Sequence, residues 1–138
     1  MNGLFYHNEI KVDSTSTTLS LLRFYENGYV IFKKITGDKE YFAKQLKTFS
    51  MTGHVVNGEP EYTFCGAFED FENDTISFKV ENEIHDPSNT WAVKDLLSFK
   101  GKVVSETELL LKSVSKATKF ELENKYLKTT DQDLLNEL

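Results

Sequence analysis

Alternation of apolar and polar residues with a period of two is the feature that most constrains how this chain folds. Ile76-Ser77-Phe78-Lys79-Val80 shows it most cleanly, and it recurs in Leu22-Arg23-Phe24, Leu97-Ser98-Phe99-Lys100 and Phe120-Glu121-Leu122-Glu123. Successive side chains of a β-strand point to opposite faces of the sheet, so each of these segments is predicted to be a half-buried strand. The pattern predicts an all-β domain and leaves its chemistry open.

The segment around Asn27-Gly28 predicts a hairpin, because Asn-Gly between two apolar runs is a strong hairpin signal. A two-residue turn would pair Leu22 with Lys33 and place a lysine among core residues. A three-residue loop with a left-handed Gly28 pairs Leu22 with Phe32 instead. A one-residue slip turns every side chain to the other face, so the cleaner separation of apolar from polar residues favours the longer loop. That register puts three residues together on the opposite face: Arg23, Tyr25 and Lys33.

The period changes after Gly37, where Asp38 can cap a helix with its carboxylate. Phe42, Leu46 and Phe49 then recur at helical spacing, so a helix is predicted over residues 38–50, with its apolar stripe covering an opening or a face of the sheet. The predicted strands are Gly3–His7, Leu19–Tyr25, Tyr29–Ile35, Tyr62–Phe68 (followed by a bulge at Glu69-Asp70), Thr75–Val80, Leu96–Val104, Leu109–Val114 and Thr118–Tyr126.

Eight antiparallel strands joined mostly by short turns are expected to close into an up-and-down barrel, with one helix inserted after the third strand. Residues 1–128 would form this barrel, and residues 129–138 a flexible or short helical tail. The side chains expected inside the barrel are Leu22, Phe24, Val30, Phe32, Phe64, Phe68, Ile76, Phe78, Val80, Phe99, Val103, Phe120 and Leu122. An OB-like fold, whose helix also follows strand three, would leave three further strands unexplained.

Charge and composition exclude several classes of partner. The net charge is −6, with 22 acidic and 16 basic residues, and the basic residues form no stripe that would bind nucleic acid. No apolar run approaches the ~20 residues of a membrane span. The first residues lack a signal peptide and Cys65 is the single cysteine, so a cytoplasmic location is expected. A secreted protein shortened at its N-terminus would share these features.

No motif predicts a metal, a cofactor or a catalytic group, and the protein is expected not to be an enzyme. His7, His54 and His85 are far apart and are interpreted as surface residues beside turns. Cys65 points away from Phe64 by parity, which favours simple packing under a helix or loop over a nucleophilic role. The cluster Glu69, Asp70, Glu72 and Asp74 does not match a calcium loop and is expected to be solvated.

Three segments carry a resemblance to a known group of proteins. Leu22-Arg23-Phe24-Tyr25-Glu26-Asn27-Gly28-Tyr29-Val30 resembles the L-R-F-Y-E-[DN]-G-x-V hairpin of small uncharacterised lipocalin-like proteins. Glu72–Phe78 and Phe99–Val104 are similar to their G-N-x-I-S-F and Y-K-G-x-I strands. The match spans residues 17–126 in order. It implies a calycin-type barrel of eight to ten strands that often holds a small hydrophobic molecule.

Two departures keep the family's ligand residues from being carried over. Lipocalins have an early Gly-x-Trp, whereas this chain has Gly3-Leu4-Phe5 and its one tryptophan is Trp91. Fatty-acid-binding proteins place a helical pair after the first strand and use a late Arg-x-Tyr, which Phe120–Tyr126 lacks. Function by fold alone is an analogy.

The aromatic interior remains the candidate for function. A packed core is the ordinary state of a small barrel, but Gly66 and Gly101 lie inward by parity and would leave room among their phenylalanine neighbours. We therefore expect a small hydrophobic ligand between Phe24, Phe32, Phe64, Phe78 and Phe99, with Asn82 and Asn124 at the rim. The alternative is a protein–protein interaction module with a packed core, whose partner binds an exposed Tyr/Arg face formed by Arg23, Tyr25, Tyr29 and Ile31.

Overall fold

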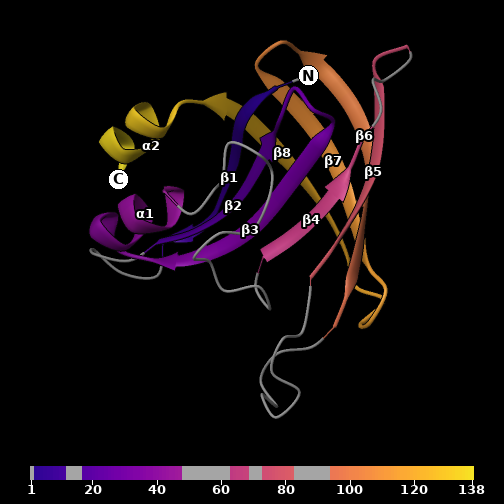
Figure 1. Cartoon of the computed structure of the whole chain (residues 1–138), viewed down its shortest axis with the longest axis horizontal. Coiled ribbons are helices and arrows are strands. Elements are labelled where there is room, and N and C mark those ends of the chain that lie inside the picture. Colours follow the sequence, from indigo (N-terminus) through magenta and orange to yellow (C-terminus); the bar gives the residue numbers. More distant parts are fainter. Residues whose placement is uncertain (1, 12–16, 48–62, 69–72, 83–93) are drawn as a thin grey trace.

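The computed structural model describes residues 2–11, 17–47, 63–68, 73–82 and 94–138, and of residues 8–11 only the backbone (Figure 1). The elements are β1 (Gly3–Lys11), β2 (Thr17–Phe24), β3 (Tyr29–Gly37), α1 (Lys39–Leu46), β4 (Thr63–Ala67), β5 (Thr75–Glu81), β6 (Leu96–Ser105), β7 (Glu108–Ser115), β8 (Glu121–Thr129) and α2 (Asp131–Glu137). The predicted bulge at Glu69-Asp70 lies outside the described residues.

The eight strands form one closed antiparallel barrel in chain order, β1 to β8, which confirms the predicted fold class. Closure comes from β1 against β8, where Tyr6 lies opposite Leu127. Between β4 and β5 the described residues share one paired position in the strands, Cys65 opposite Glu81, and an isolated bridge from Phe68 to Phe78. These two seams are the least extensively paired parts of the wall.

The barrel has two different ends. At one end, which we call the turn end, short turns join β2 to β3 and β6 to β7. At the other, the loop end, β1, β3, β5 and β7 finish. The β2–β3 hairpin has the predicted register, with Leu22 opposite Phe32 and Phe24 opposite Val30. Its loop is closed by the Tyr25 N–H, which donates to the Tyr29 carbonyl oxygen at 2.9 Å, and Gly28 adopts a left-handed φ of +84°.

Helix α1 begins where it was predicted to begin. The carboxylate of its N-cap residue, Asp38, accepts a hydrogen bond of 2.9 Å from the backbone N–H of Tyr41. The helix ends at Leu46, and the predicted residues 48–50 lie outside the described part of the chain. Phe42 and Leu46 are buried against the outer face of the barrel wall, so the helix covers a face of the sheet.

Helix α2 follows β8 directly and packs on the same outer face (Figure 1). The Thr130 hydroxyl caps it by accepting a hydrogen bond of 3.1 Å from the Asp133 N–H. Leu134 is fully buried in the outer cluster. An ion pair between Arg23 and Asp131, and a hydrogen bond of 2.8 Å from the Tyr6 hydroxyl to Glu137, tie both ends of the helix to the wall.

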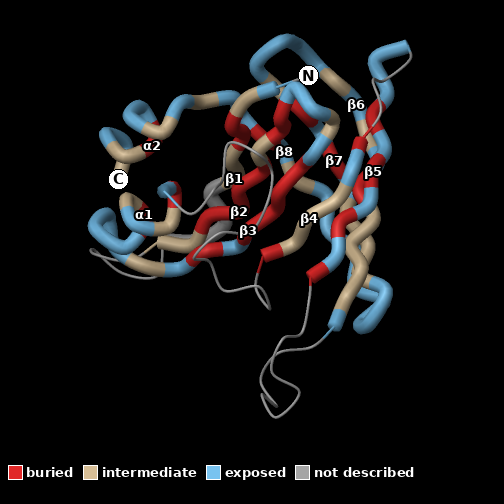
Figure 2. Tube along the Cα trace, in the orientation of Figure 1, coloured by how far each residue is buried: buried red, intermediate tan, exposed pale blue. Residues whose placement is uncertain are grey.

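The wall made by β2 and β3 is therefore buried on both sides (Figure 2). Its inner side belongs to the interior core, which comprises Phe5, Leu22, Phe24, Val30, Phe32, Phe68, Ile76, Phe78, Val80, Phe99, Leu109, Leu111 and Tyr126. Its outer side belongs to a second core beneath the two helices: Leu4, Leu19, Leu21, Tyr25, Ile31, Ile35, Phe42, Leu46 and Leu134. Two-sided burial explains why Val30-Ile31-Phe32 is uninterrupted by polar residues.

Most of the predicted inward residues lie in the interior core or pack against it, but two do not. Phe120 precedes β8 and is 63% exposed, and Leu122 lies on the interior side of β8 yet is 38% exposed. Both lie near the loop end, beyond the packed part of the core. The residues that the alternation missed are Phe5, Leu109, Leu111 and Tyr126. Leu109 to Leu111 is a run of three leucines that shows no alternation.

Tyr25 lies in the outer core with only 7% of its surface exposed, and its buried hydroxyl has no hydrogen-bond partner among the described residues. Tyr25→Phe is therefore expected to raise the free energy of unfolding by about 1 kcal/mol, because it removes an unsatisfied buried polar group. Equilibrium urea unfolding at pH 7 measures this. Tyr41→Phe, at an exposed tyrosine of α1, is the matched control and should leave stability unchanged.

The same hydroxyl should also make stability depend on alkaline pH. Burial raises the pKa of Tyr25 to about 12. The unfolded chain then loses this proton near pH 10 while the folded protein keeps it. Stability is therefore independent of this group below pH 10 and falls as the pH rises towards 12. Tyr25→Phe should remove that part of the alkaline loss, and an unchanged pH profile would contradict the assignment.

Candidate functional site

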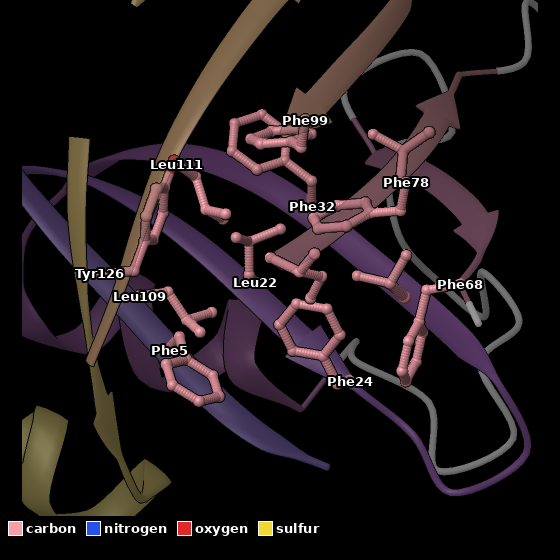
Figure 3. Close-up of a cluster of buried hydrophobic side chains, with 13 residues drawn as sticks. Phe5, Leu22, Phe24, Phe32, Phe68, Phe78, Phe99, Leu109, Leu111 and Tyr126 are labelled. Atoms are coloured by element: carbon pink, nitrogen blue, oxygen red, sulfur yellow. The ribbon is translucent and has the colours of Figure 1, made fainter. Parts of the chain in front are cut away.

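The turn-end half of the barrel interior is filled by aromatic rings that pack on one another (Figure 3). Phe24 lies edge-on to three of them, with ring centroids at 5.7 Å from Phe5, 5.1 Å from Phe68 and 5.5 Å from Phe78. Phe78 stacks on Phe99 at 4.9 Å. These rings fill the interior there, as in an ordinary core.

The two inward glycines do not leave room for a ligand, which corrects the interpretation made from their parity. A Cβ added at Gly66 would overlap the carbonyl oxygen of Lys79, and one added at Gly101 would overlap that of Leu110. Neighbouring backbone already occupies the space beside both glycines. They allow close approach of the strands in the curved wall rather than a cavity.

Towards the loop end, the interior becomes accessible to solvent. On the interior side of β8, Tyr126 is 2% exposed, Asn124 is half-buried and Leu122 is 38% exposed. The change is similar on β6, from buried Phe99 to half-buried Leu97. Of the five predicted ligand residues, Phe24, Phe78 and Phe99 belong to the packed half. Phe32 and Phe64, in ring contact at 6.0 Å, lie nearer the accessible half.

A row of polar residues, of which Ser20 is fully buried, crosses three strands on the interior side of the barrel near the loop end. His7 lies opposite Ser20 between β1 and β2, and Ser20 lies opposite Lys34 between β2 and β3. Each shares a face with core residues two positions away, such as Phe5, Leu22 and Phe32. The signal that could have found this row is the hairpin register itself, which aligns Ser20 with Lys34.

His7 is a half-buried residue of β1, so its interpretation as a surface histidine beside a turn is wrong. Its Nδ1 lies 3.0 Å from the carbonyl oxygen of Lys125, and its ring lies 5.9 Å from that of Tyr126. A carbonyl oxygen can only accept, so Nδ1 carries the proton and Nε2 is the acceptor of the neutral ring. His54 and His85 lie outside the described residues.

Asn82 and Asp95 organise the rim of the loop end. The side-chain oxygen of Asn82 accepts from the Asp95 N–H at 2.9 Å. The Asp95 carboxylate accepts from the Ser115 hydroxyl at 2.6 Å and from the N–H groups of Leu96 and Ala117 at 2.8 and 2.9 Å. Burial alone would raise the pKa of Asp95, but these hydrogen bonds outweigh it and hold the pKa below its ordinary value.

The predicted exposed Tyr/Arg face does not exist. Ile31 and Tyr25 are buried beneath the helices, and the Arg23 side chain is largely covered and paired with Asp131. Tyr29 alone of the four is exposed. The prediction failed because alternation shows which face of the sheet a side chain lies on, but not whether another element packs on that face. Cys65 lies on this outer side, half-buried against the outer core, as its parity predicted.

The described residues line two hollows in the surface of the barrel. One, of about 730 Å³, lies at the turn end and is lined by Asn2, Gly3, Leu4, Arg23, Phe24, Tyr25, Glu26, Asn27, Thr129, Thr130 and Asp131. The other, of about 210 Å³, lies beside α1 and is lined by Lys33, Lys34, Ile35, Thr36, Tyr41, Gln45 and Thr63. Sequence reasoning predicted neither.

Within the described ranges, no three His, Cys, Asp or Glu side chains are grouped closely enough to hold a metal ion. Of the predicted solvated carboxylates, Asp74 is exposed in a turn, and the other three lie outside those ranges. Neither α1 nor α2, the helices that the structure describes, has the length and apolar content to cross a membrane.

Comparison with known proteins gives no relative: no family model, no curated protein and no solved structure matches this chain. The closed eight-stranded antiparallel barrel is thus established by the structure itself.

Proposed function

We propose that this protein is a non-enzymatic, lipocalin-like binder of a small hydrophobic molecule, which enters the barrel at the loop end. The observation that carries the proposal is the rise in exposure of interior-facing apolar residues towards that end, from buried Tyr126 to Leu122. Apolar side chains that face inward and yet reach solvent offer a surface that an apolar ligand would desolvate. The filled half then forms the floor of the site.

The ligand position differs from the one expected from the sequence. The interlocked rings of Phe24, Phe78 and Phe99 leave those residues as floor and support. Phe32 and Phe64, with Leu97 and Leu122, are the residues we assign to the ligand. All four come from different strands, so a ligand there would contact several walls of the barrel at once.

The proposal is for binding and not for catalysis, since no motif in the sequence predicts a catalytic group. His7 lies opposite Ser20, and its ring makes a hydrogen bond to the Lys125 carbonyl oxygen. Cytoplasmic location remains our expectation from the single cysteine.

Titration with N-phenyl-1-naphthylamine, a neutral apolar dye that fluoresces when it leaves water, tests the proposal. We expect saturable binding that Leu122→Asp weakens at least about tenfold, because a carboxylate in the site must be desolvated by the dye. Leu110→Asp is a matched control, since Leu110 is equally exposed but lies on the outer side of β7. Absence of saturable binding, or equal losses in the two variants, would refute the proposal.

A further inference from the structure

We infer that the outer face of β5, β6 and β7 is a docking surface for an extended acidic segment of a partner protein. The surface, which we call the lysine face, consists of Lys79, Lys100, Lys102 and the exposed Leu110. Lys102 lies opposite Leu110, and Lys79 is diagonal to Lys100, which is paired with Ser77. The strand ladder, rather than the order of residues in the chain, brings these lysines together. This surface is outside the barrel and independent of the proposed interior site.

The three lysines of this face form no ion pair with any acid that the structure describes. Two neighbouring acids are engaged elsewhere, Glu121 with Lys112 at 3.0 Å and Glu108 with Lys125 at 3.4 Å. Lys100 lies directly opposite Lys112, and like charges in that position destabilise an antiparallel pair. Such a cluster, in a chain of net charge −6, is suited to a partner that supplies negative charge.

No described element covers the lysine face. Along β5 every second residue is exposed, from Thr75 to Glu81, and these are the outward positions. Helices α1 and α2 pack beside β1, β2 and β3, on the other side of the barrel from β5 and β6 (Figure 1). Leu110 is exposed within the face, and Val104 is exposed where β6 ends. A partner segment that carries both carboxylates and an apolar residue would therefore match the face.

The spacing of the lysines matches a partner in extended conformation. Lys100 and Lys102 are two residues apart on one side of β6, which is about 6.6 Å along the strand. Carboxylates at alternate positions of an extended segment recur at the same interval. An apolar residue two positions further along that segment would lie beside Leu110 or Val104.

The acids of β8 favour a narrow partner over a broad polyanion. Glu121 and Glu123 are exposed on the outer side of β8, in the same wall of the barrel. A single segment along β6 would contact the lysines without reaching β8, which is two strands or about 9.6 Å away. An anionic membrane or a nucleic acid is wide enough to meet these carboxylates as well, and both are repelled by the net negative charge of the chain.

Titration of the full, isotope-labelled chain with the peptide acetyl-TETETLT-amide, followed by amide NMR, tests this inference. We expect saturable chemical-shift changes that are largest on β5, β6 and β7 around the lysine face. The matched peptide acetyl-TQTQTLT-amide should bind about fivefold more weakly, because two exposed ion pairs together contribute about that factor.

A protein with both Lys100→Gln and Lys102→Gln should bind the acidic peptide about fivefold more weakly than the wild type. The matched control combines Lys39→Gln and Lys44→Gln, which remove the same charge from exposed positions of α1. Leu110→Ser should weaken the acidic peptide about threefold, because the leucine of the peptide loses an apolar contact. Urea unfolding of each variant checks that it is folded.

Absence of saturable shifts, shifts centred away from the lysine face, or equal affinity for the two peptides would overturn the inference. Oligothymidylate and phosphatidylcholine vesicles that contain phosphatidylserine serve as comparison probes. Tighter binding of either probe to the lysine face would overturn the protein segment in favour of a nucleic acid or a membrane. Concentration-dependent shifts on this face without any peptide would overturn it in favour of a second copy of the chain.

Discussion

Phe24→Ala is expected to lower the free energy of unfolding by about 3–5 kcal/mol. Phe24 is fully buried, and its ring lies edge-on to those of Phe5, Phe68 and Phe78, which come from three other parts of the chain. Alanine would leave a cavity that these rings could not fill without losing their own contacts. Equilibrium urea unfolding, followed by far-UV circular dichroism, measures the loss.

Phe120→Ala is the matched control, because it deletes the same ring where it is 63% exposed. It should change stability by less than about 0.5 kcal/mol. The comparison separates ring burial from any general effect of removing a phenylalanine. Comparable losses in the two variants would show that the packed half of the interior is not where the structure puts it. Tyr25→Ala is not a suitable control, since Tyr25 is itself buried in the outer core.

Gly101→Ala should destabilise the barrel by about 3 kcal/mol or more, an unusually large effect for one added methyl group. The new Cβ would overlap the carbonyl oxygen of Leu110, which belongs to the backbone of β7 and cannot turn aside as a side chain would. Relief of the overlap requires β6 and β7 to separate, and that breaks ladder hydrogen bonds on both sides of the glycine.

Lys100→Ala and Lys102→Ala, on either side of Gly101 in β6, provide the controls. Both lysines are exposed on the outer side, so each change should alter stability by less than about 0.5 kcal/mol. Thermal and urea unfolding of the three variants give the comparison. A Gly101→Ala protein as stable as the wild type would mean that the two strands do not approach so closely.

The fold was predictable because local signals agreed with one another. Period-two alternation located the strands, and the Asn27-Gly28 turn fixed a register that the structure reproduces at Leu22–Phe32. Asp38 marked the start of the helix through its capping carboxylate. Each of these signals depends on residues close together in the chain, which is the information that one sequence contains.

The site was less predictable because it depends on contacts between residues that are far apart in the sequence. Parity placed Gly66 and Gly101 inward but could not show that backbone from the next strand fills the space beside them. Parity also put Tyr25 and Ile31 outside the barrel but could not show that Leu134, over a hundred residues later, covers them. The hydrogen-bond partner of His7 could not be predicted either, because Lys125 is 118 residues away in the sequence and lies beside His7 only in the closed barrel.

Neighbouring strands of the barrel are paired to different extents, and this determines where the wall opens most easily. The hairpin of β2 and β3 has a core on each side, whereas the described residues of β4 and β5 share one paired position, Cys65 opposite Glu81, and the nearby bridge from Phe68 to Phe78. Segments with few hydrogen bonds and little burial separate at the lowest free energy. The sparsely paired β4–β5 seam is therefore where we expect the wall to open at the lowest free energy, while the hairpin of β2 and β3 stays closed.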